Sequence, residues 1–112
     1  MNRFQRAIQI WSILICAALE RKTYTYGQIA NILSFQGAGT LSQFLEPIMK
    51  YCEQKNYPPL TILIVYQNTG IPGEGLITIN IENINSERER VFNFDWFSIE
   101  PPEANDLQNL FI

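Results

Sequence analysis

Residues 25–33 of the chain are Thr25-Tyr26-Gly27-Gln28-Ile29-Ala30-Asn31-Ile32-Leu33. The threonine and the glutamine three places later match a capping box, in which each side chain accepts a hydrogen bond from the other residue's backbone N–H. The apolar residues that follow supply the buried face of a helix (Ile29, Ala30, Ile32 and Leu33). The pattern therefore predicts a short helix that begins just after Thr25.

Longer helices are predicted on both sides of this stretch. Before it, apolar residues recur at steps of three and four from Phe4 to Ala18, which predicts an amphipathic helix over residues 3–21. After it, residues 34–39 contain two glycines and are typical of a turn. Thr40-Leu41-Ser42-Gln43 repeats the capping signature and predicts a third helix, which Pro47 either kinks or divides into two pieces.

A β-hairpin is predicted after the third helix. Residues 60–66 follow Pro58-Pro59 and are rich in β-branched side chains, so they are typical of a buried strand. Residues 67–75 are dense in turn formers, and residues 76–81 alternate as a half-buried strand does. Together these segments predict two strands joined by a long tip.

The order of these elements indicates an α+β fold, a single winged helix-turn-helix-like domain over residues 1–112. The length of 112 residues leaves no room for a second core of useful size. From about residue 82 to residue 112 we expect an acidic, aromatic C-terminal extension. A third capping box, Ser86-Glu87-Arg88-Glu89, predicts a short helix there that carries Val91 and Phe94 and can extend to Phe97, and Pro101-Pro102 introduces a tail.

The composition argues against several classes of enzyme. The chain contains no histidine, which removes the Ser-His-Asp, Cys-His and histidine–metal arrangements. Residues 70–75 are rich in glycine but lack the lysine and the Ser/Thr of a P-loop. They are either a structured hairpin tip or a ligand contact. We expect a protein that is not an enzyme, with no cofactor and no metal site.

The cysteines and the N-terminal stretch indicate in which cell compartment the protein is expected. Cys16 and Cys52 lack the spacing of a redox or zinc motif, so we expect buried free thiols in a reducing cytoplasm. The apolar stretch 7–19 follows two arginines, as in a signal peptide, but Gln9 and Ser12 interrupt it and it is too short to span a bilayer. We expect a buried first helix in a cytoplasmic protein without a membrane partner.

Three stretches carry a resemblance to a known family. Thr25-Tyr26-Gly27-Gln28-Ile29-Ala30, Pro58-Pro59-Leu60-Thr61-Ile62-Leu63-Ile64 and the segment Gly70–Leu76 resemble the DNA-binding domain of alkylguanine-DNA alkyltransferases and alkyltransferase-like proteins. The resemblance covers about residues 23–77 and implies a winged helix that binds DNA. Alkyl transfer is not implied, because Val65-Tyr66-Gln67-Asn68 stands where the family has its reactive Pro-Cys-His-Arg run. The DNA contacts that this reading predicts are Thr40, Ser42, Gln43, Lys50, Tyr66 and Asn68.

Formal charge divides the chain into unequal parts. Residues 1–25 carry +3, residues 26–75 carry −1 and residues 76–112 carry −5, for a net charge of −3. The third predicted helix offers only Lys50 and Lys55, against two glutamates, which is weak for phosphate neutralisation. The acidity of the last third instead favours a basic protein partner.

Two functions therefore remain, and the first is preferred. It is a small acidic binding protein that occludes a basic partner, as an immunity protein or antitoxin does against a nuclease toxin. Its predicted contact residues are Phe94, Asp95, Trp96, Phe97, Glu100 and Glu103. The aromatic residues among them could alternatively pack against the winged-helix body. The second function is a winged-helix DNA-binding protein similar to the alkyltransferase-like proteins.

Overall fold

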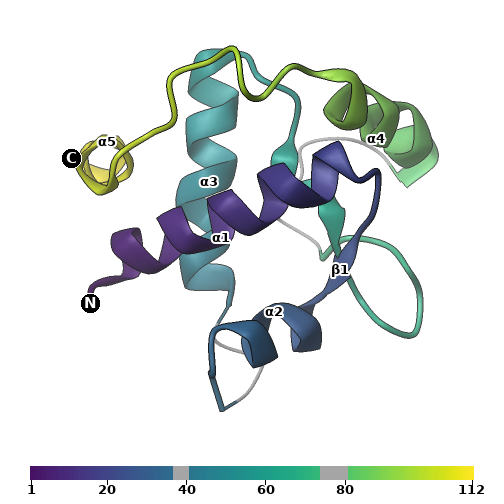
Figure 1. The fold of residues 1–112 in the computed structure, drawn as a ribbon, viewed down its shortest axis with the longest axis horizontal. Coiled ribbons are helices and arrows are strands. Elements are labelled where there is room, and N and C mark those ends of the chain that lie inside the picture. Colours follow the sequence, from purple (N-terminus) through teal and green to yellow (C-terminus); the bar gives the residue numbers. More distant parts are fainter. Residues whose placement is uncertain (37–40, 74–80) are drawn as a thin grey trace.

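The computed structural model describes residues 1–36, 41–73 and 81–112. They form a mostly helical α+β domain with a two-stranded sheet (Figure 1). The α-helices are α1 (Arg3–Leu19), α2 (Tyr26–Ile32), α3 (Ser42–Lys55), α4 (Ile84–Asn93) and α5 (Ala104–Gln108). The strands are β1 (Tyr24–Thr25) and β2 (Ile64–Val65), and the 3₁₀ helices are η2 (Leu60–Leu63), η3 (Ile81–Asn83) and η4 (Asn109–Phe111).

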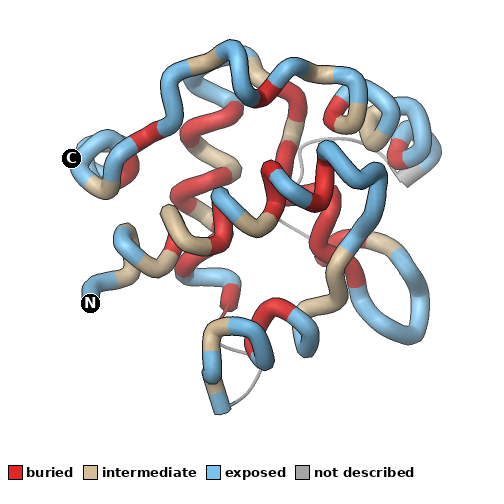
Figure 2. The backbone as a smooth tube through the Cα atoms, in the orientation of Figure 1, coloured by how far each residue is buried: buried red, intermediate tan, exposed pale blue. Residues whose placement is uncertain are grey.

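Helices α1 and α3 cross at the centre of the molecule and share the core. The apolar stripe of α1 is buried there, with Ile10 and Leu14 fully enclosed. Leu45 and Ile48 of α3 are fully enclosed as well, and buried positions line both helices (Figure 2). The predicted first helix is confirmed and ends at Leu19, two residues earlier than expected. Amphipathic patterning was sufficient to predict it because its buried face is continuous.

The capping box at Thr25 is confirmed, because both of its hydrogen bonds are present. The Gln28 backbone N–H donates to Thr25 Oγ1 at 3.1 Å, and the Thr25 N–H donates to Gln28 Oε1 at 2.8 Å. These bonds satisfy backbone donors that a helix start leaves without an intrahelical acceptor. The helix that follows, α2, spans Tyr26–Ile32, so the predicted start after Thr25 is confirmed. Of the predicted buried face, Ile29 and Ala30 are buried, whereas Ile32 is 51% exposed and Leu33 is the C-cap residue.

Helix α3 is continuous through Pro47, so the chain is not divided there. Its N-cap position is Leu41, which makes no side-chain capping bond, and the predicted cap Thr40 lies outside the described residues. Pro47 is itself buried in the sixth position of the helix.

The two cysteines are free thiols in different environments. Cys52 is buried in α3 and Cys16 is exposed on α1, so the expectation of two buried thiols is wrong for Cys16. The stripe of α1 explains the difference, since Cys16 lies between the buried residues Ile15 and Ala17 but on the opposite face. Burial raises the pKa of the Cys52 thiol to about 12.

Most of the strand predicted over residues 60–66 is a 3₁₀ helix. Leu60–Leu63 forms η2, which packs against α1 and α3, and only Ile64–Val65 is a strand. The Ile62 N–H donates to the Pro59 carbonyl at 3.0 Å, which starts the turn. Strand β2 pairs in parallel with β1, with Tyr24 opposite Ile64. The strand predicted over residues 76–81 lies outside the described residues except at Ile81, which begins η3.

The chain after β2 forms a compact loop over residues 66–73. The Tyr66 N–H donates to the Ile71 carbonyl at 2.9 Å, and Gly70 adopts a left-handed conformation with φ of 70°. Arg88 of α4 donates to the Gly70 carbonyl at 2.6 Å, and the Gly73 N–H donates to the Tyr26 hydroxyl at 3.0 Å. In its described part this glycine-rich segment is therefore held by bonds within the protein.

The C-terminal part contains two helices where one was predicted. Helix α4 begins at Ile84, so Ser86 is not its cap and instead donates from Oγ to the Asn83 carbonyl at 3.0 Å. It ends at Asn93, which leaves Phe94 and Phe97 beyond it. The predicted tail contains α5, which packs against α1 and α3 through the fully buried Leu107. The chain between α4 and α5 passes over one end of α3 (Figure 1).

Candidate functional site

Much of the positive charge near the N-terminus is already paired. Arg21 Nη2 lies 2.5 Å from Glu89 Oε1, and Lys22 Nζ lies 2.8 Å from Glu20 Oε2. The hydrogen bond from Arg21 holds the pKa of the Glu89 carboxyl below its ordinary value. All four side chains are about half exposed, so the pairs contribute little to stability. They do reduce the positive charge that residues 1–25 present to a partner.

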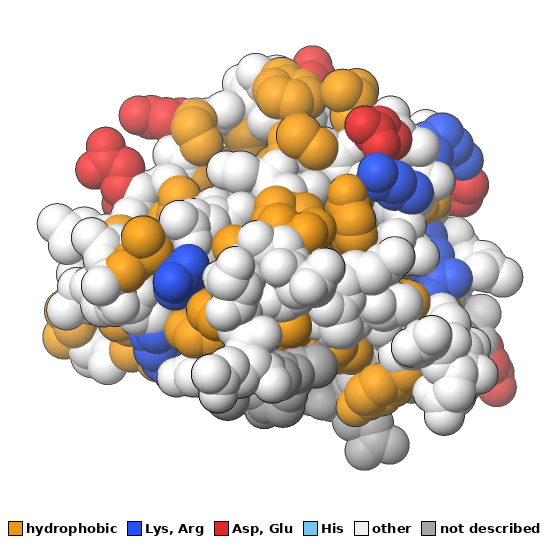
Figure 3. Space-filling view, turned by 60° about the horizontal axis from the view of Figure 1, so that its bottom comes forward, with side chains coloured by type: hydrophobic (Ala, Val, Ile, Leu, Met, Phe, Trp, Pro, Cys, Tyr) orange, Lys and Arg blue, Asp and Glu red, His pale blue; other side chains and the backbone are white. Residues whose placement is uncertain are grey.

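The carboxylates that follow α4 are in the opposite situation. We call residues 95–106 the acidic segment; its acidic residues are Asp95, Glu100, Glu103 and Asp106. All four are exposed, and none has a Lys or Arg nitrogen within 4 Å among the residues that the structure describes. One makes a local bond, in which the Glu103 N–H donates to Asp106 Oδ2 at 2.8 Å. In Figure 3 acidic side chains lie at the upper left, at the top and along the right of that face, and those at the upper left and the top have no basic side chain beside them.

The structure divides the predicted aromatic contact residues into buried and exposed ones. Trp96 is only 6% exposed, and its indole Nε1 donates to the Val91 carbonyl at 2.8 Å. Phe94 is half-buried, with its ring centroid 4.5 Å from that of Trp96. Phe97 is 68% exposed. The Trp96 ring therefore belongs to the core and not to a surface patch, because its indole N–H finds an acceptor there.

Trp96 and Phe94 belong to a continuous group of aromatic rings that reaches α3. The Tyr57 centroid lies 5.4 Å from Phe94 and 6.1 Å from Trp96. Tyr51 continues the group, 6.2 Å from Tyr57 and 5.7 Å from Trp11. We call these five residues the aromatic group. Its edge-to-face and tilted contacts hold Tyr51 and Tyr57 in fixed positions.

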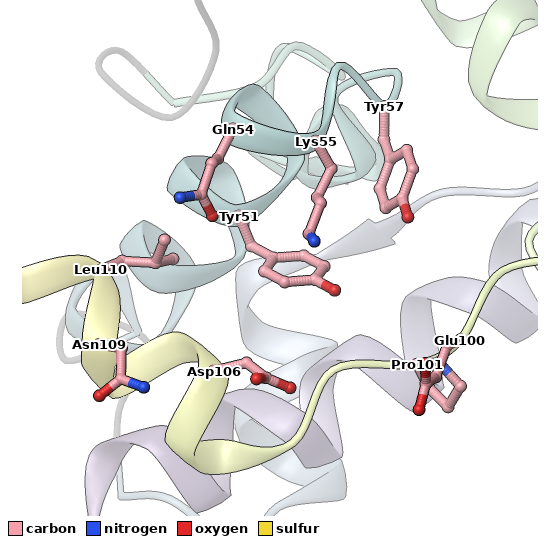
Figure 4. A pocket seen from close by; sticks show the side chains of 9 residues that line it. All are labelled: Tyr51, Gln54, Lys55, Tyr57, Glu100, Pro101, Asp106, Asn109 and Leu110. Atoms are coloured by element: carbon pink, nitrogen blue, oxygen red, sulfur yellow. The ribbon is translucent and has the colours of Figure 1, made fainter.

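A cavity of about 500 Å³ opens beside this aromatic group, between the C-terminal end of α3 and residues 100–110 (Figure 4). Tyr51, Lys55 and Tyr57 line it from the α3 side. Glu100, Pro101 and Asp106 line it from the acidic segment on the other side. The cavity thus has an aromatic wall and an acidic wall, contributed by parts of the chain about half its length apart.

The electrostatic environment of Tyr51 reflects both walls. Burial raises the pKa of its hydroxyl, and the negative charges of Asp106 and Glu100 raise it further. Lys55 Nζ lies 5.8 Å from the centroid of the Tyr51 ring. Among the described residues no carboxylate lies within 4 Å of that ammonium group. The cavity therefore holds two carboxylates and one ammonium that are not paired with each other.

Tyr51, Tyr57 and Asp106 were not predicted as site residues from the sequence. Tyr57 is brought back beside α3 by Asn56, which adopts the left-handed conformation with φ of 59°. The Tyr57 N–H then donates to the Cys52 carbonyl at 2.9 Å, as in a helix C-terminal motif. The sequence signal for this turn is Asn56, which directly precedes Tyr57 and Pro58-Pro59.

The residues of the predicted DNA-binding face are spread over separate elements. Ser42 and Gln43 are exposed at the start of α3, whereas the Lys50 ammonium lies 5.1 Å from the Phe111 ring centroid in η4. Tyr66 is 48% exposed and its ring lies 5.0 Å from that of Tyr26. Asn68 is exposed in the loop after β2, and Thr40 lies outside the described residues. Part of the predicted reader helix is covered, since α5 and η4 both pack against α3.

Comparisons with known proteins add no family or function. No protein-family model, no curated protein and no solved structure matches the chain. Among the described helices none is long and apolar enough to cross a membrane. The candidate site is thus defined by its geometry: the acidic segment with Phe97, and the cavity between that segment and α3.

Proposed function

We propose that this chain is a non-catalytic acidic protein that binds and occludes a basic protein partner, in the manner of an immunity protein or antitoxin directed at a nuclease. The observation that carries the proposal is the set of exposed, unpaired carboxylates in the acidic segment. A domain of net charge −3 that pairs Arg21 and Lys22 internally presents four such carboxylates there.

Unpaired carboxylates of this kind act first on the rate of association. Clustered charge of one sign attracts an oppositely charged partner and raises association rates by about 10- to 1,000-fold. The effect does not require the carboxylates to be buried, and it falls as salt screens them. A basic nuclease has the matching surface, because its own substrate is a polyanion.

Phe97 supplies an apolar contact within the same segment. It is 68% exposed and directly follows the anchored Trp96, so the backbone that carries it is held in place. Aromatic residues that become buried on binding often dominate the energy of an interface, provided that polar groups surround them. Asp95 and Ser98 flank this region with exposed polar side chains.

Photo-crosslinking tests the proposal directly. A benzophenone amino acid is placed at position 97 or at position 19, where Leu19 is 69% exposed on α1 and provides a matched control. In native lysate we expect position 97 to capture a basic protein and position 19 not to capture it. Asp95→Lys with Glu103→Lys should reduce that capture and slow association most at low salt. Equal capture from both positions, or capture that ignores the charge reversal, would overturn the proposal.

Winged-helix DNA binding remains a second candidate because of one observation. Arg3 and Lys50 both lie over the ring of Phe111, 4.6 Å and 5.1 Å from its centroid, and neither has a carboxylate within 4 Å in the described parts of the chain. Two free cations beside α3 could contact phosphates. The test is binding to a short random duplex: a dissociation constant that rises steeply with salt and worsens in Lys50→Gln supports this function. Absence of binding at low salt rejects it.

A further inference from the structure

We propose that the cavity between α3 and the acidic segment receives a single arginine side chain of the basic partner. The inference rests on the proposed function and names the contact by which the partner is recognised. The partly exposed ring of Tyr57 would stack against the guanidinium group, the accessible edge of Tyr51 would line the site, and Glu100 and Asp106 would accept the hydrogen bonds.

The aromatic wall is suited to a cation. The face of a tyrosine ring attracts positive charge, and arginine takes this position more often than lysine because its planar group also stacks. The fold already holds a cation near this ring, since Lys55 Nζ lies 5.8 Å from the Tyr51 centroid. In Figure 4 the Lys55 amine lies on the α3 side of Tyr51, and Asp106 lies on the other side.

The acidic wall supplies the acceptors. Glu100 and Asp106 approach the cavity from the acidic segment, and neither is paired with a Lys or Arg in the part of the chain that the structure describes. A carboxylate can accept two parallel N–H bonds from guanidinium, which a lysine ammonium cannot reproduce with the same geometry. With Lys55 counted, the residues that line the cavity carry a net formal charge of −1, so a cationic ligand is favoured over an anionic one.

The size and rigidity of the cavity agree with this occupant. A volume of about 500 Å³ accommodates a guanidinium group with its aliphatic stem, and lies within the range of pre-formed ligand sites. Tyr51 is only 6% exposed, and Tyr57 is held by Phe94 and Trp96. Binding therefore orders few further side chains of this chain, which lowers its entropic cost.

The test uses N-acetyl-L-arginine amide as the probe and N-acetyl-L-citrulline amide as its uncharged control. Binding is followed by NMR of protein labelled at the tyrosine rings. We expect saturable shifts of the Tyr51 and Tyr57 signals with the arginine probe, and an affinity about tenfold or more weaker for citrulline, which lacks the charge. Glu100→Gln with Asp106→Asn should weaken the arginine probe to a similar extent. Lys55→Gln should tighten it, because the competing cation is removed.

Three results would overturn the inference: equal binding of arginine and citrulline, no shift at either tyrosine, or unchanged binding in the Glu100→Gln, Asp106→Asn variant. The spectrum of each variant without probe shows whether it is folded. Failure here is distinguishable from failure of the proposed function, because Asp95 and Glu103 do not line the cavity. If crosslinking at position 97 still depends on their charge while the probe does not bind, the cavity inference falls and the proposed function stands. If the probe binds but no basic protein is captured, the proposed function falls, and with it the assignment of the arginine to a basic partner, whereas the preference of the cavity for a guanidinium group stands.

Discussion

The helical body, by which we mean helices α1 to α4 with the chain that joins them, and the acidic segment use their charged side chains in different ways. In the body, Arg21 and Lys22 are paired with glutamates, and Arg3 and Arg6 lie over the rings of Phe111 and Phe35. In the acidic segment the carboxylates have no such partners among the described residues. That segment is attached by apolar residues instead, Trp96 near its start and Leu107 just after its end. Its carboxylates are therefore without ion pairs in the described fold and open to a partner, although Asp106 also accepts a hydrogen bond from the Glu103 N–H at the start of α5.

The largest expected effect comes from breaking the apolar attachment. Trp96→Ala should lower the free energy of unfolding by about 3–5 kcal/mol, because it removes a buried ring from the aromatic group and leaves the Val91 carbonyl without its indole donor. Urea denaturation measures the change. The matched control is Phe97→Ala, whose side chain is exposed, with an expected change within about 0.5 kcal/mol. Similar losses for both variants would mean that Trp96 is not the anchor.

High pH should destabilise the body through Cys52. In the folded state the Cys52 thiol has a pKa of about 12, above the ordinary value of 9.0. The protonated thiol therefore stabilises the folded state fully below pH 9, and this contribution is lost as the pH rises toward 12. We compare Cys16→Ala with the double variant Cys16→Ala, Cys52→Ala. Between pH 9 and 12 the free energy of unfolding of the single variant should fall more steeply, by up to about 1.4 kcal/mol per pH unit. Urea titrations at several alkaline pH values measure it. Identical slopes in the two proteins would contradict the burial of this thiol.

A smaller effect is expected at the capping box of the body. Thr25→Ala removes the acceptor for the Gln28 N–H and should cost about 1 kcal/mol. Thr23→Ala is the control, because Thr23 is exposed and lies outside the helices and strands of the fold. Thermal or urea unfolding distinguishes the two variants, and equal stability would show that the cap contributes nothing.

The smallest change in stability is expected for a variant of the acidic segment, which should have a large effect on binding to the partner. Asp95→Asn with Glu103→Gln removes two unpaired charges, and the free energy of unfolding should shift by less than about 0.5 kcal/mol. The same variant should slow association with the basic partner, and the difference should shrink as salt is added. A large loss of stability would mean that these carboxylates belong to the fold, and the contrast between the two regions would be lost.

Local patterns predicted the parts of the fold whose signals are local. The stripe of α1 and the capping box at Thr25 are short-range features, and both are confirmed. Leu60–Leu63 was assigned to a strand because a buried run of apolar and β-branched residues suits both a buried strand and a buried 3₁₀ turn. The choice between them depends on packing against α1 and α3, and the parallel pairing of β2 with β1 joins residues 40 positions apart.

The candidate site was predicted only in part for the same reason. Glu100 was expected to contact a partner, and it lines the cavity. Tyr51 and Tyr57 had no such signal, because nothing local shows that a turn at Asn56 brings them to face residues 100–110. Trp96 was predicted as a partner contact, with packing against the body as the alternative. The structure buries it, since Trp11, Tyr57 and Phe94 enclose its ring.

The sequence by itself determined that α1 and α2 form and where α2 begins, how charge is distributed along the chain, and which histidine-dependent chemistries are absent. Each of these follows from residue type and short-range periodicity. Only the tertiary structure decided which charges are paired, which aromatic rings are buried, and that α3 and the acidic segment enclose a cavity. These properties depend on contacts between residues far apart in the chain, and such contacts form only when the apolar surfaces of separate elements pack together.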